Sequence, residues 1–403
     1  MQESFKSVHL SHEKDEKLCD ISRFGQKTAE KTMAFHRSFP EYAVTPLADL
    51  KGLAQMLGVQ SIHVKDESKR FGLNAFKVLG GSYAIGSYIA KTLGMDISEL
   101  SCERMTSPAV KAKLGDLTFV TATDGNHGRG VAWTANRLGQ KCVVYMPKGT
   151  ASERLENIRK LGADASIMDF GYDDCVRLAR DNAAKHGWIL VQDTALDGYE
   201  EIPARIMEGY LTMGLEAVHQ LNGVMPTHVF LQAGVGAMAG AITAFFANIC
   251  GKSQRPTVVI VEPNKADCFY RTAYANDGRL HAVTGPMDSI MAGLCCGEPC
   301  PIAWDILHDY ADDFISMPDY IAAKGMRILG NPLTDDPRVI SGESGASTTG
   351  LVAEIMQNDS LDWLRSQLRL DASSRILCIS TEGDTDKSKY RRIVWDGLIQ
   401  AIE

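Results

Sequence analysis

The chain has 403 residues, of which 45% are hydrophobic and 23% are charged, and its formal net charge is −8. These values suit a globular protein of two or three compact units and exclude a disordered, fibrous or disulfide-stapled chain. The acidic surplus contains no basic block, so neither nucleic acid nor a membrane surface is expected as a partner. Small molecules or further copies of the chain are the partners to expect.

The cysteines and the apolar stretches predict a cytoplasmic protein without a membrane segment. Ten cysteines lie at scattered spacings with no CxxC pair, which favours reduced thiols. The first 17 residues lack the apolar core of a signal peptide. Residues 229–251 carry no charge and approach the length of a bilayer span, but Gly234, Gly236 and Gly240 indicate a strand, a glycine loop and a buried helix instead.

Short aliphatic or β-branched runs alternate with helical patterns along the chain. This alternation predicts an α/β fold with parallel sheets and helices on both faces. The expected strands lie within residues 61–66, 117–125, 141–149, 187–194, 227–234, 257–263 and 375–383, and the clearest helices are 152–161 and 202–221. Ligands of such sheets bind at the carboxyl ends of strands, which makes the turns 121–129, 193–199, 233–240 and 380–387 the candidate site.

Lys77 is the only charged residue between Phe71 and Ala90. Burial disfavours the ammonium form of a lysine, and a neutral amine can form a Schiff base with a carbonyl compound. The alternative is a lysine whose stem packs against apolar neighbours while its amine reaches solvent.

The turn after the strand near 117 reads TDGNHG. Its backbone amides suit a carboxylate, Asn126 could hold a cofactor oxygen, and the Asp124 carboxylate could take a proton. The alternative is that the DGN triplet only forms the turn, with His127 structural. Asp193 ends a later strand, and its alternatives are a helix cap or a solvated carboxylate.

The segment LQAGVGAMAG follows a strand and opens a helix, so its amides suit an anion. With Glu262 at the end of the next strand it imitates a dinucleotide fingerprint, although the glycine spacing is one residue off. A loop of this kind serves equally for a single phosphate group, or it packs closely without any ligand.

Two further groups of residues carry weaker signals. The loop STEGDTD after the last strand is acidic but lacks the spacing of a calcium loop. Cys295, Cys296 and Cys300 match no zinc spacing and are expected to be buried or edge thiols. No metal site is therefore predicted.

In this order the motifs resemble the pyridoxal-phosphate enzymes of the two-domain tryptophan synthase β-like fold (fold type II). Within that superfamily the chain is similar to the diaminopropionate ammonia-lyase family from about residue 40 to 395. The segments that carry this resemblance are KDESKRFGLNAFK, TDGNHGRGVAW, YMPKG, VQDTA, LQAGVGAMAG, VEPNKADC, MAGLCCGEP, ISGESGA and STEGDTD.

The resemblance implies that Lys77 holds pyridoxal 5'-phosphate covalently and that Asn126 lies near its pyridine hydroxyl. Thr381 falls where the superfamily places a hydroxyl partner for the ring nitrogen, with Asp384 and Thr385 as close alternatives. The implied phosphate site is formed by Gly234, Val235, Gly236, Ala237 and Met238, and the implied cradle for the substrate carboxylate by Thr123, Asp124, Gly125, Asn126 and His127.

Two departures from the dehydratases of this superfamily bear on the chemistry. The residue two before Lys77 is Ala75 rather than serine, and Asp124 replaces a hydroxyl residue. An anionic Asp124 can attract a second ammonium group or act as a base. The resemblance thus implies elimination of ammonia from 2,3-diaminopropionate, giving pyruvate and two ammonia. Lys77 would take the Cα proton of the L-isomer and Asp124 that of the D-isomer, while Asp193 would orient or protonate the distal nitrogen.

Three other functions remain open: a serine or threonine dehydratase of the same fold, a nicotinamide oxidoreductase, and a catalytically silent amino-acid-binding homologue. The expected domains are a discontinuous large domain, residues 1–85 with 199–403, and a small domain, residues 86–198. The family resemblance favours a homodimer.

Overall fold

The computed structural model describes residues 5–12, 18–123, 125–251, 254–333 and 335–400. Eleven strands form two sheets within these residues. The large sheet has the order β1 (Lys6–His9), β10 (Asp313–Met317), β9 (Thr257–Pro263), β8 (His228–Gln232), β11 (Arg375–Ser380), β3 (Ser61–Asp66) and β2 (Leu47–Asp49). The small sheet has the order β6 (Asp164–Ile167), β5 (Lys141–Met146), β4 (Thr118–Ala122) and β7 (Ile189–Leu190).

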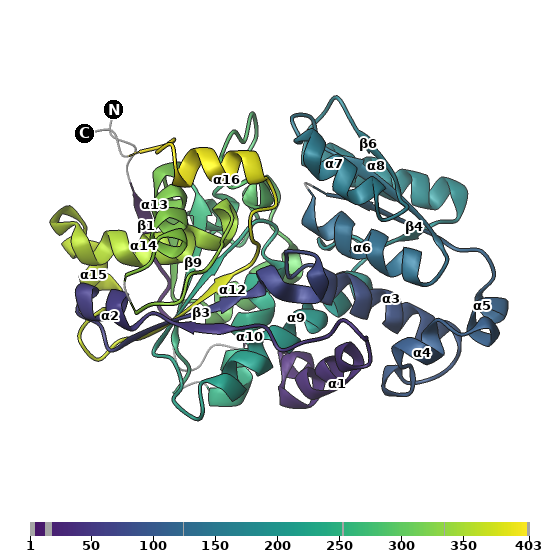
Figure 1. The fold of residues 1–403 in the computed structure, drawn as a ribbon, viewed down its shortest axis with the longest axis horizontal. Helices are drawn as coiled ribbons and strands as arrows, with labels where there is room; N and C mark the ends of the chain where they lie inside the picture. The colour runs from purple at the N-terminus through teal and green to yellow at the C-terminus, as the bar shows by residue number, and fades with distance from the viewer. Residues whose placement is uncertain (1–4, 13–17, 124, 252–253, 334, 401–403) are drawn as a thin grey trace.

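Helices cover both sheets and fill the space between them (Figure 1). The helices are α1 (Gln26–Arg37), α2 (Lys51–Leu57), α3 (Val78–Thr92), α4 (Cys102–Met105), α5 (Pro108–Leu114), α6 (Asn126–Arg137), α7 (Ser152–Arg159), α8 (Tyr172–His186), α9 (Glu201–Gln220), α10 (Ala237–Cys250), α11 (Cys268–Ala275), α12 (Pro301–Tyr310), α13 (Asp319–Gly330), α14 (Glu343–Gln357), α15 (Asp362–Gln367) and α16 (Lys387–Val394). Short 3₁₀ turns complete them, among them η2 (Glu67–Gly72).

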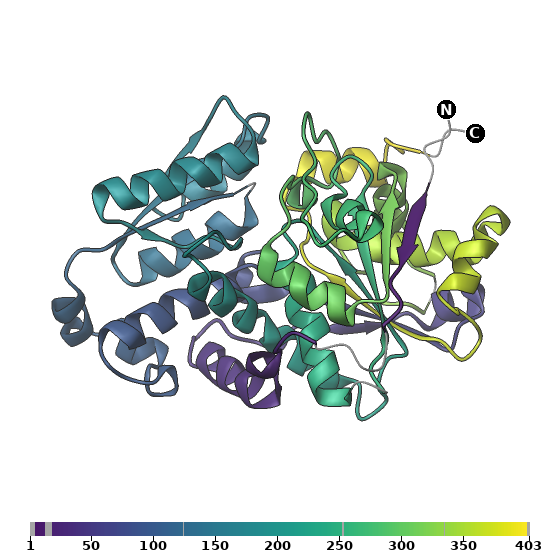
Figure 2. The same ribbon diagram turned by 180° about the vertical axis from the view of Figure 1, so that it is seen from behind.

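The central strands of the large sheet are buried on both faces. In β8, Val229 and Leu231 join one apolar core while Phe230 joins the other. Side chains alternate between the faces of a strand, so a strand with two buried faces reads as a continuous apolar run. Helices α9, α10 and α12 pack together on one side, and α13 packs along α14 on the other, as the opposite views in Figures 1 and 2 show. This confirms the predicted α/β fold with flanked parallel sheets.

All seven predicted strands are present, but β7 is reduced to residues 189–190. Four strands were not predicted, and two of them, β1 and β2, lie antiparallel at the edges of the large sheet. Strands of three or four residues with mixed polarity give no periodic signal, which explains why β1, β2 and β6 were missed. In the described part of the chain, no helix is long and apolar enough to cross a membrane, and the uncharged stretch forms β8 and buried α10.

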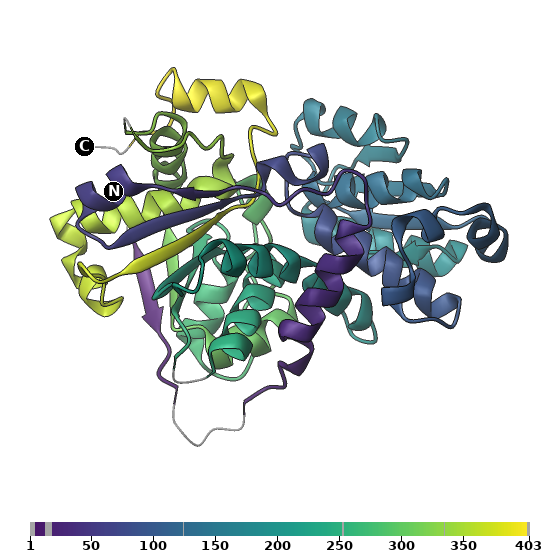
Figure 3. The ribbon, with the colours of Figure 1, turned by 60° about the horizontal axis from the view of Figure 1, so that its bottom comes forward.

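Helices α1, α3 and α9 lie between the two sheets (Figure 3). Helix α3 packs against α9 and also against α6, which covers the small sheet. The strands of the small sheet lie within residues 118–190, inside the range expected for a small domain. The boundaries at residues 86 and 198 stay predictions.

A buried ionic cluster fixes the chain just before Lys77. Arg70 in η2 donates from Nε to Glu67 at 2.8 Å and from its terminal nitrogens to Glu216 of α9 at 2.8 and 2.9 Å. Lys65 of β3 donates to the same Glu216 at 2.8 Å. Because each buried charge has an opposite partner, the cluster specifies one arrangement of β3, η2 and α9, although such clusters add little net stability. It thereby anchors the segment that presents Lys77.

Candidate active site

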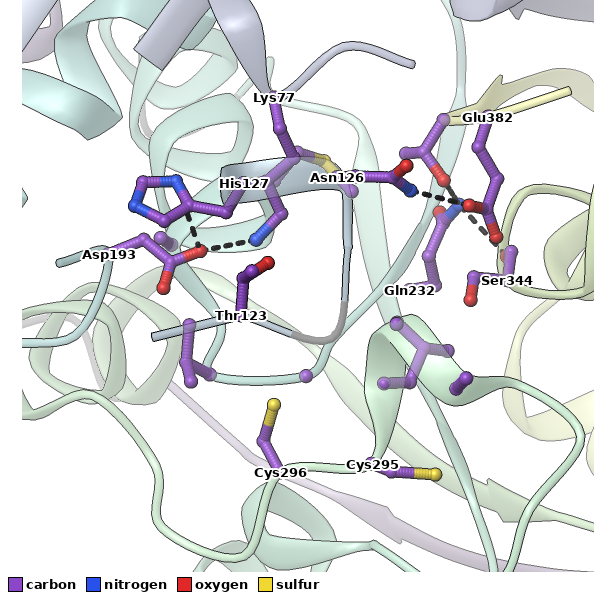
Figure 4. Close-up of a pocket in the computed structure, with 18 of the residues that line it drawn as sticks. Lys77, Thr123, Asn126, His127, Asp193, Gln232, Cys295, Cys296, Ser344 and Glu382 are labelled. Atoms are coloured by element: carbon purple, nitrogen blue, oxygen red, sulfur yellow. Dashed lines mark hydrogen bonds and ion pairs between the residues drawn. The ribbon is translucent and has the colours of Figure 1, made fainter. Parts of the chain in front are cut away.

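One pocket is lined by residues at the ends of four strands, two from each sheet, and by Lys77, which directly precedes α3. It lies where β4, β7, β8 and β11 end, which is the position predicted from the four turns. Lys77 lies between two groups of polar side chains in the pocket (Figure 4). The predicted site residues that line it are Lys77, Thr123, Asn126, His127, Asp193, Gly234, Val235, Gly236, Ala237, Met238 and Thr381. Asp124 lies outside the described residues, and Gly125 is not among the described residues lining the pocket.

Lys77 is paired with Asp193, as Figure 4 shows. Its Nζ donates a hydrogen bond to Asp193 Oδ2, and 19% of the lysine side chain is exposed against 2% of the aspartate side chain. The amine therefore faces the pocket and not bulk solvent, unlike a lysine that only rests its stem on the protein. A carboxylate in contact with this amine can accept or return its proton.

Asp193 is held in place from three directions. Tyr172 Oη and Gln192 Nε2 both donate to its Oδ1, each at 3.2 Å, and Lys77 Nζ donates to its Oδ2. Burial alone raises the pKa of Asp193, but the charge of Lys77 and the hydrogen bonds from Lys77 and Tyr172 outweigh it. The pKa of Asp193 consequently falls well below its usual range, and the side chain is an anion.

His127 is buried and directed away from solvent. One ring nitrogen, Nε2, lies 2.8 Å from the carbonyl oxygen of Val191, which can only accept, so Nε2 carries the hydrogen. Burial lowers the pKa of His127 in spite of the neighbouring Asp193 carboxylate. The imidazole is therefore neutral. Its hydrogen bond to Val191 links the turn after β4 to the turn after β7.

The turn after β4 is organised around Thr123. Its hydroxyl oxygen accepts hydrogen bonds from the backbone amides of Gly125 at 2.9 Å and Gly128 at 3.1 Å. Gly125 has φ = 154°, a backbone conformation that residues other than glycine rarely adopt. The first residue of α6, Asn126, then projects its carboxamide into the pocket, where Nδ2 donates to Glu382 Oε2 at 2.5 Å.

The glycine loop forms the floor of the pocket at the start of α10. Gly236 has φ = 87°, and a Cβ there would overlap the Phe269 ring, so only glycine fits. Among the described residues, no side chain caps the α10 N-terminus. Free amides and the positive end of the helix dipole suit a phosphate group.

Thr381 lies at the end of β11 beside Gln232 at the end of β8. The Gln232 carboxamide donates to Thr381 Oγ1 at 3.0 Å and to the Ile379 carbonyl at 2.9 Å. Since Thr381 Oγ1 accepts from Gln232, its own hydrogen is free to be donated elsewhere. A ring nitrogen with a lone pair is a suitable acceptor.

The pocket includes residues that the sequence did not assign to it. Glu382 was noted only as part of an acidic loop, and Cys295 and Cys296 only as buried or edge thiols, whereas all three line the pocket. Tyr172 opens α8 and Ser344 lies in the first turn of α14, where no local pattern marks a site residue. The ESGA segment was the one signal for Ser344. No group of histidine, cysteine or acidic residues in the described ranges could hold a metal ion.

The described residues fit pyridoxal phosphate. They supply an amine at Lys77, a helix N-terminus for a phosphate, and a hydroxyl at Thr381. Gln232 Oε1, Ser344 Oγ and Glu382 Oε1 are buried without a hydrogen-bond partner among the described residues, so polar atoms remain for a ligand. Together with the two flanked parallel sheets, these features define a pyridoxal-phosphate enzyme of fold type II.

Known proteins agree with this class. The family model "Pyridoxal-phosphate dependent enzyme" matches residues 39–379. A diaminopropionate ammonia-lyase from Salmonella typhimurium is 53% identical over 384 residues, covering 94% of each chain. The crystal structure of holo diaminopropionate ammonia-lyase from Escherichia coli has a TM-score of 0.91 and 45% identity over 100% of both chains, and its complex with D-serine has a TM-score of 0.90 and 46% identity over 100% of both. The chain belongs to the diaminopropionate ammonia-lyase family of pyridoxal-phosphate-dependent enzymes.

Proposed function

We propose that the protein converts 2,3-diaminopropionate to pyruvate and two molecules of ammonia. The observation that carries this proposal is the contact between Lys77 Nζ and the buried Asp193 carboxylate beside a phosphate-binding loop. A proton acceptor and an anion stand together where an amino acid with two ammonium groups would react. The names of the relatives from Salmonella and Escherichia support the same substrate.

Bound pyridoxal phosphate supplies an electron sink that makes the Cα proton of an amino acid acidic. Lys77 Nζ, once released as a free amine, takes that proton from the L-isomer, and Asp124 takes it from the D-isomer. Asp193 holds the distal ammonium, so that this nitrogen departs as ammonia when the Cα–H electrons form the Cα–Cβ double bond. Water then replaces the remaining nitrogen, which gives pyruvate and the second ammonia.

The other assigned residues bind and orient. The amides of residues 234–238 would hold the phosphate of the cofactor, Asn126 would contact its pyridine hydroxyl, and Thr381 would donate to its ring nitrogen. The residues 123–127 receive the substrate carboxylate. Burial of Asp193, at 1% exposure, excludes water from the charged groups that face the substrate and strengthens their interactions.

The test is an assay of pyruvate and ammonia from D- and L-2,3-diaminopropionate, with and without added pyridoxal phosphate. We expect two ammonia per pyruvate and dependence on the cofactor. Serine is the control substrate, because the Escherichia coli relative has been crystallised with D-serine and serine elimination yields only one ammonia. Turnover of serine or threonine above that of both diaminopropionate isomers would assign a dehydratase instead.

The proposal includes the organisation of the protein. We infer a discontinuous large domain, residues 1–85 with 199–403, a small domain, residues 86–198, and a cytoplasmic homodimer. The arrangement of the strands in two sheets supports the two domains. The family resemblance supports the dimer, and the scattered cysteines support the cytoplasmic location. Sedimentation of the holoenzyme tests the dimer.

A further inference from the structure

Glu382 is a buried carboxylate in the wall of the pocket, and neither the sequence nor the reaction assigns it a role. The residue is 2% exposed. Its Oε2 accepts hydrogen bonds from Asn126 Nδ2 at 2.5 Å and from Thr385 Oγ1 at 3.3 Å, whereas Oε1 has no hydrogen-bond partner among the described residues. A buried carboxyl oxygen without a hydrogen-bond partner is costly in a folded protein, so its presence here requires an explanation.

The backbone of Glu382 is fixed more firmly than that of an ordinary loop residue. Its carbonyl accepts a hydrogen bond from the Gly342 amide at 2.9 Å, and the residue bridges to Ala75, two positions before Lys77. The neighbouring Thr381 carbonyl accepts from the Phe76 amide at 3.0 Å. The carboxylate is therefore presented from the same rigid frame that presents the lysine.

Asn126 belongs to the other side of the pocket. It opens α6, which covers the small sheet, whereas Glu382 follows β11 of the large sheet. In Figure 4 the Asn126 carboxamide points toward the Glu382 carboxylate. A carboxamide can turn over and exchange its oxygen and nitrogen, but an ionised carboxylate only accepts hydrogen bonds. Glu382 therefore selects the orientation in which the Asn126 NH₂ group faces it and keeps one further N–H for the pocket.

We propose that Glu382 is a positioning residue that fixes the Asn126 carboxamide as a hydrogen-bond donor to the pyridine hydroxyl of the cofactor. This inference rests on the cofactor-binding role given to Asn126 under the proposed function. Glu382 acts through Asn126 and needs no contact of its own with the cofactor. Thr385 holds the Glu382 carboxylate from behind.

A double-mutant cycle on cofactor affinity tests this role. The variants are Glu382→Leu, Asn126→Ala and the combination of the two, with Glu382→Gln as the conservative variant. The readouts are the dissociation constant of pyridoxal phosphate, from titration of the apoprotein followed by visible absorbance, and the wavelength of the bound cofactor. Thermal unfolding of each apoprotein confirms that it folds. Asp336→Asn is the matched control. Asp336 is also a buried carboxylate, but it accepts hydrogen bonds from the amides of Gly52 and Leu53, and none of these three residues lines the pocket.

We expect Glu382→Leu to weaken cofactor binding about ten- to hundredfold, the usual effect of losing a hydrogen bond to a charged group. Glu382→Gln should recover most of the affinity, because its amide oxygen can still accept from Asn126. In the Asn126→Ala background Glu382→Leu should change the affinity less than about threefold, since interacting residues are not additive. Asp336→Asn should bind the cofactor as the unaltered protein does.

Two results would overturn the inference. Equal loss of affinity from Glu382→Leu with and without Asn126 would mean that Glu382 acts independently of Asn126. An unchanged dissociation constant and spectrum in folded Glu382→Leu would mean that the carboxylate positions nothing. If Glu382→Leu does not fold, the same cycle is run with Glu382→Ala, which also removes the acceptor, and additivity with Asn126→Ala then refutes the role. Because affinity is measured without any amino acid, failure of the proposed reaction would leave this test intact.

Discussion

Replacing Asp193 with asparagine tests how the pocket distinguishes an ammonium group from a hydroxyl group. The asparagine side chain would keep the size of the aspartate and one oxygen acceptor but remove the negative charge. In the structure that charge is buried, and Lys77 and the hydrogen bond from Tyr172 keep the carboxyl ionised. The substitution therefore removes an anion that is present throughout the physiological pH range, and a change of protonation cannot mask the effect.

The expected magnitude follows from the two kinds of contact. A hydrogen bond to a charged group contributes about 1.5–3 kcal/mol and a neutral one about 0.5–1.5 kcal/mol. Since about 1.4 kcal/mol corresponds to tenfold, kcat/KM for diaminopropionate should fall roughly 10- to 150-fold through the lost ammonium contact. Serine presents a neutral hydroxyl, and an asparagine oxygen can still accept a hydrogen bond from it. The kcat/KM for serine should therefore fall only a fewfold through the loss of this contact. Any disturbance of Lys77 lowers both values alike and cancels in their ratio.

The assay is steady-state pyruvate formation from each diaminopropionate isomer and from serine, with the Asp193→Asn protein saturated with cofactor. The ratio of kcat/KM for diaminopropionate to that for serine should fall about tenfold or more. Tyr172→Phe is the matched control, because it removes a hydrogen bond to Asp193 Oδ1 and leaves the charge in place. An unchanged ratio in Asp193→Asn would refute the reasoning and leave Asp193 only as a partner of Lys77.

Three further predictions concern the cofactor site and stability. Lys77→Ala should abolish both turnover and the visible absorbance of the lysine-bound cofactor, and retained turnover would contradict the scheme. Gly236→Ala should weaken cofactor binding at least about tenfold, measured by titration, because a Cβ there overlaps the Phe269 ring and φ is 87°. Burial raises the pKa of Glu262 to about 8, so the unfolded chain loses a proton near pH 4.5 while the folded chain keeps it until about 8. The free energy of unfolding therefore falls as pH rises through that window, by up to about 1.4 kcal/mol per pH unit. In Glu262→Gln the thermal unfolding midpoint should depend less on pH between about pH 5 and 8. Equal pH dependence of the midpoint in both proteins would refute this prediction.

The sequence predicted the fold and most of the pocket because both depend on short-range patterns. The runs that became β8 and β11 are apolar at their centres, over residues 229–231 and 376–379, and each ends at a turn that contributes to the pocket. Ligand sites of parallel sheets lie at such ends, so the order of the turns was sufficient to locate the site. The motifs around Lys77 and Asn126 then distinguished this family from others with the same sheets.

Contacts between distant parts of the chain left no such pattern. The hydrogen bond between Asn126 and Glu382 joins residues 256 positions apart. Within its own segment, Glu382 is one of several acidic residues, and such a segment predicts a solvent-exposed side chain. Tyr172 similarly begins a helix on the small sheet, and only the folded structure brings its hydroxyl to Asp193. Residues that orient other residues are therefore harder to predict than those that carry the chemistry.

The comparison of Asp193 with Glu262 shows why residue type and position at a strand end do not determine a role. Both are fully buried carboxylates near the ends of parallel strands. Glu262 accepts hydrogen bonds from the Phe269 and Tyr270 amides at 2.9 and 2.7 Å and has no cationic partner among the described residues, so burial raises its pKa. Its oxygens are occupied in holding the start of α11, where they cannot receive the ribose that a dinucleotide fingerprint requires. Asp193 instead faces an amine in the pocket, and that difference in partners separates a structural acid from one that can meet a cationic substrate.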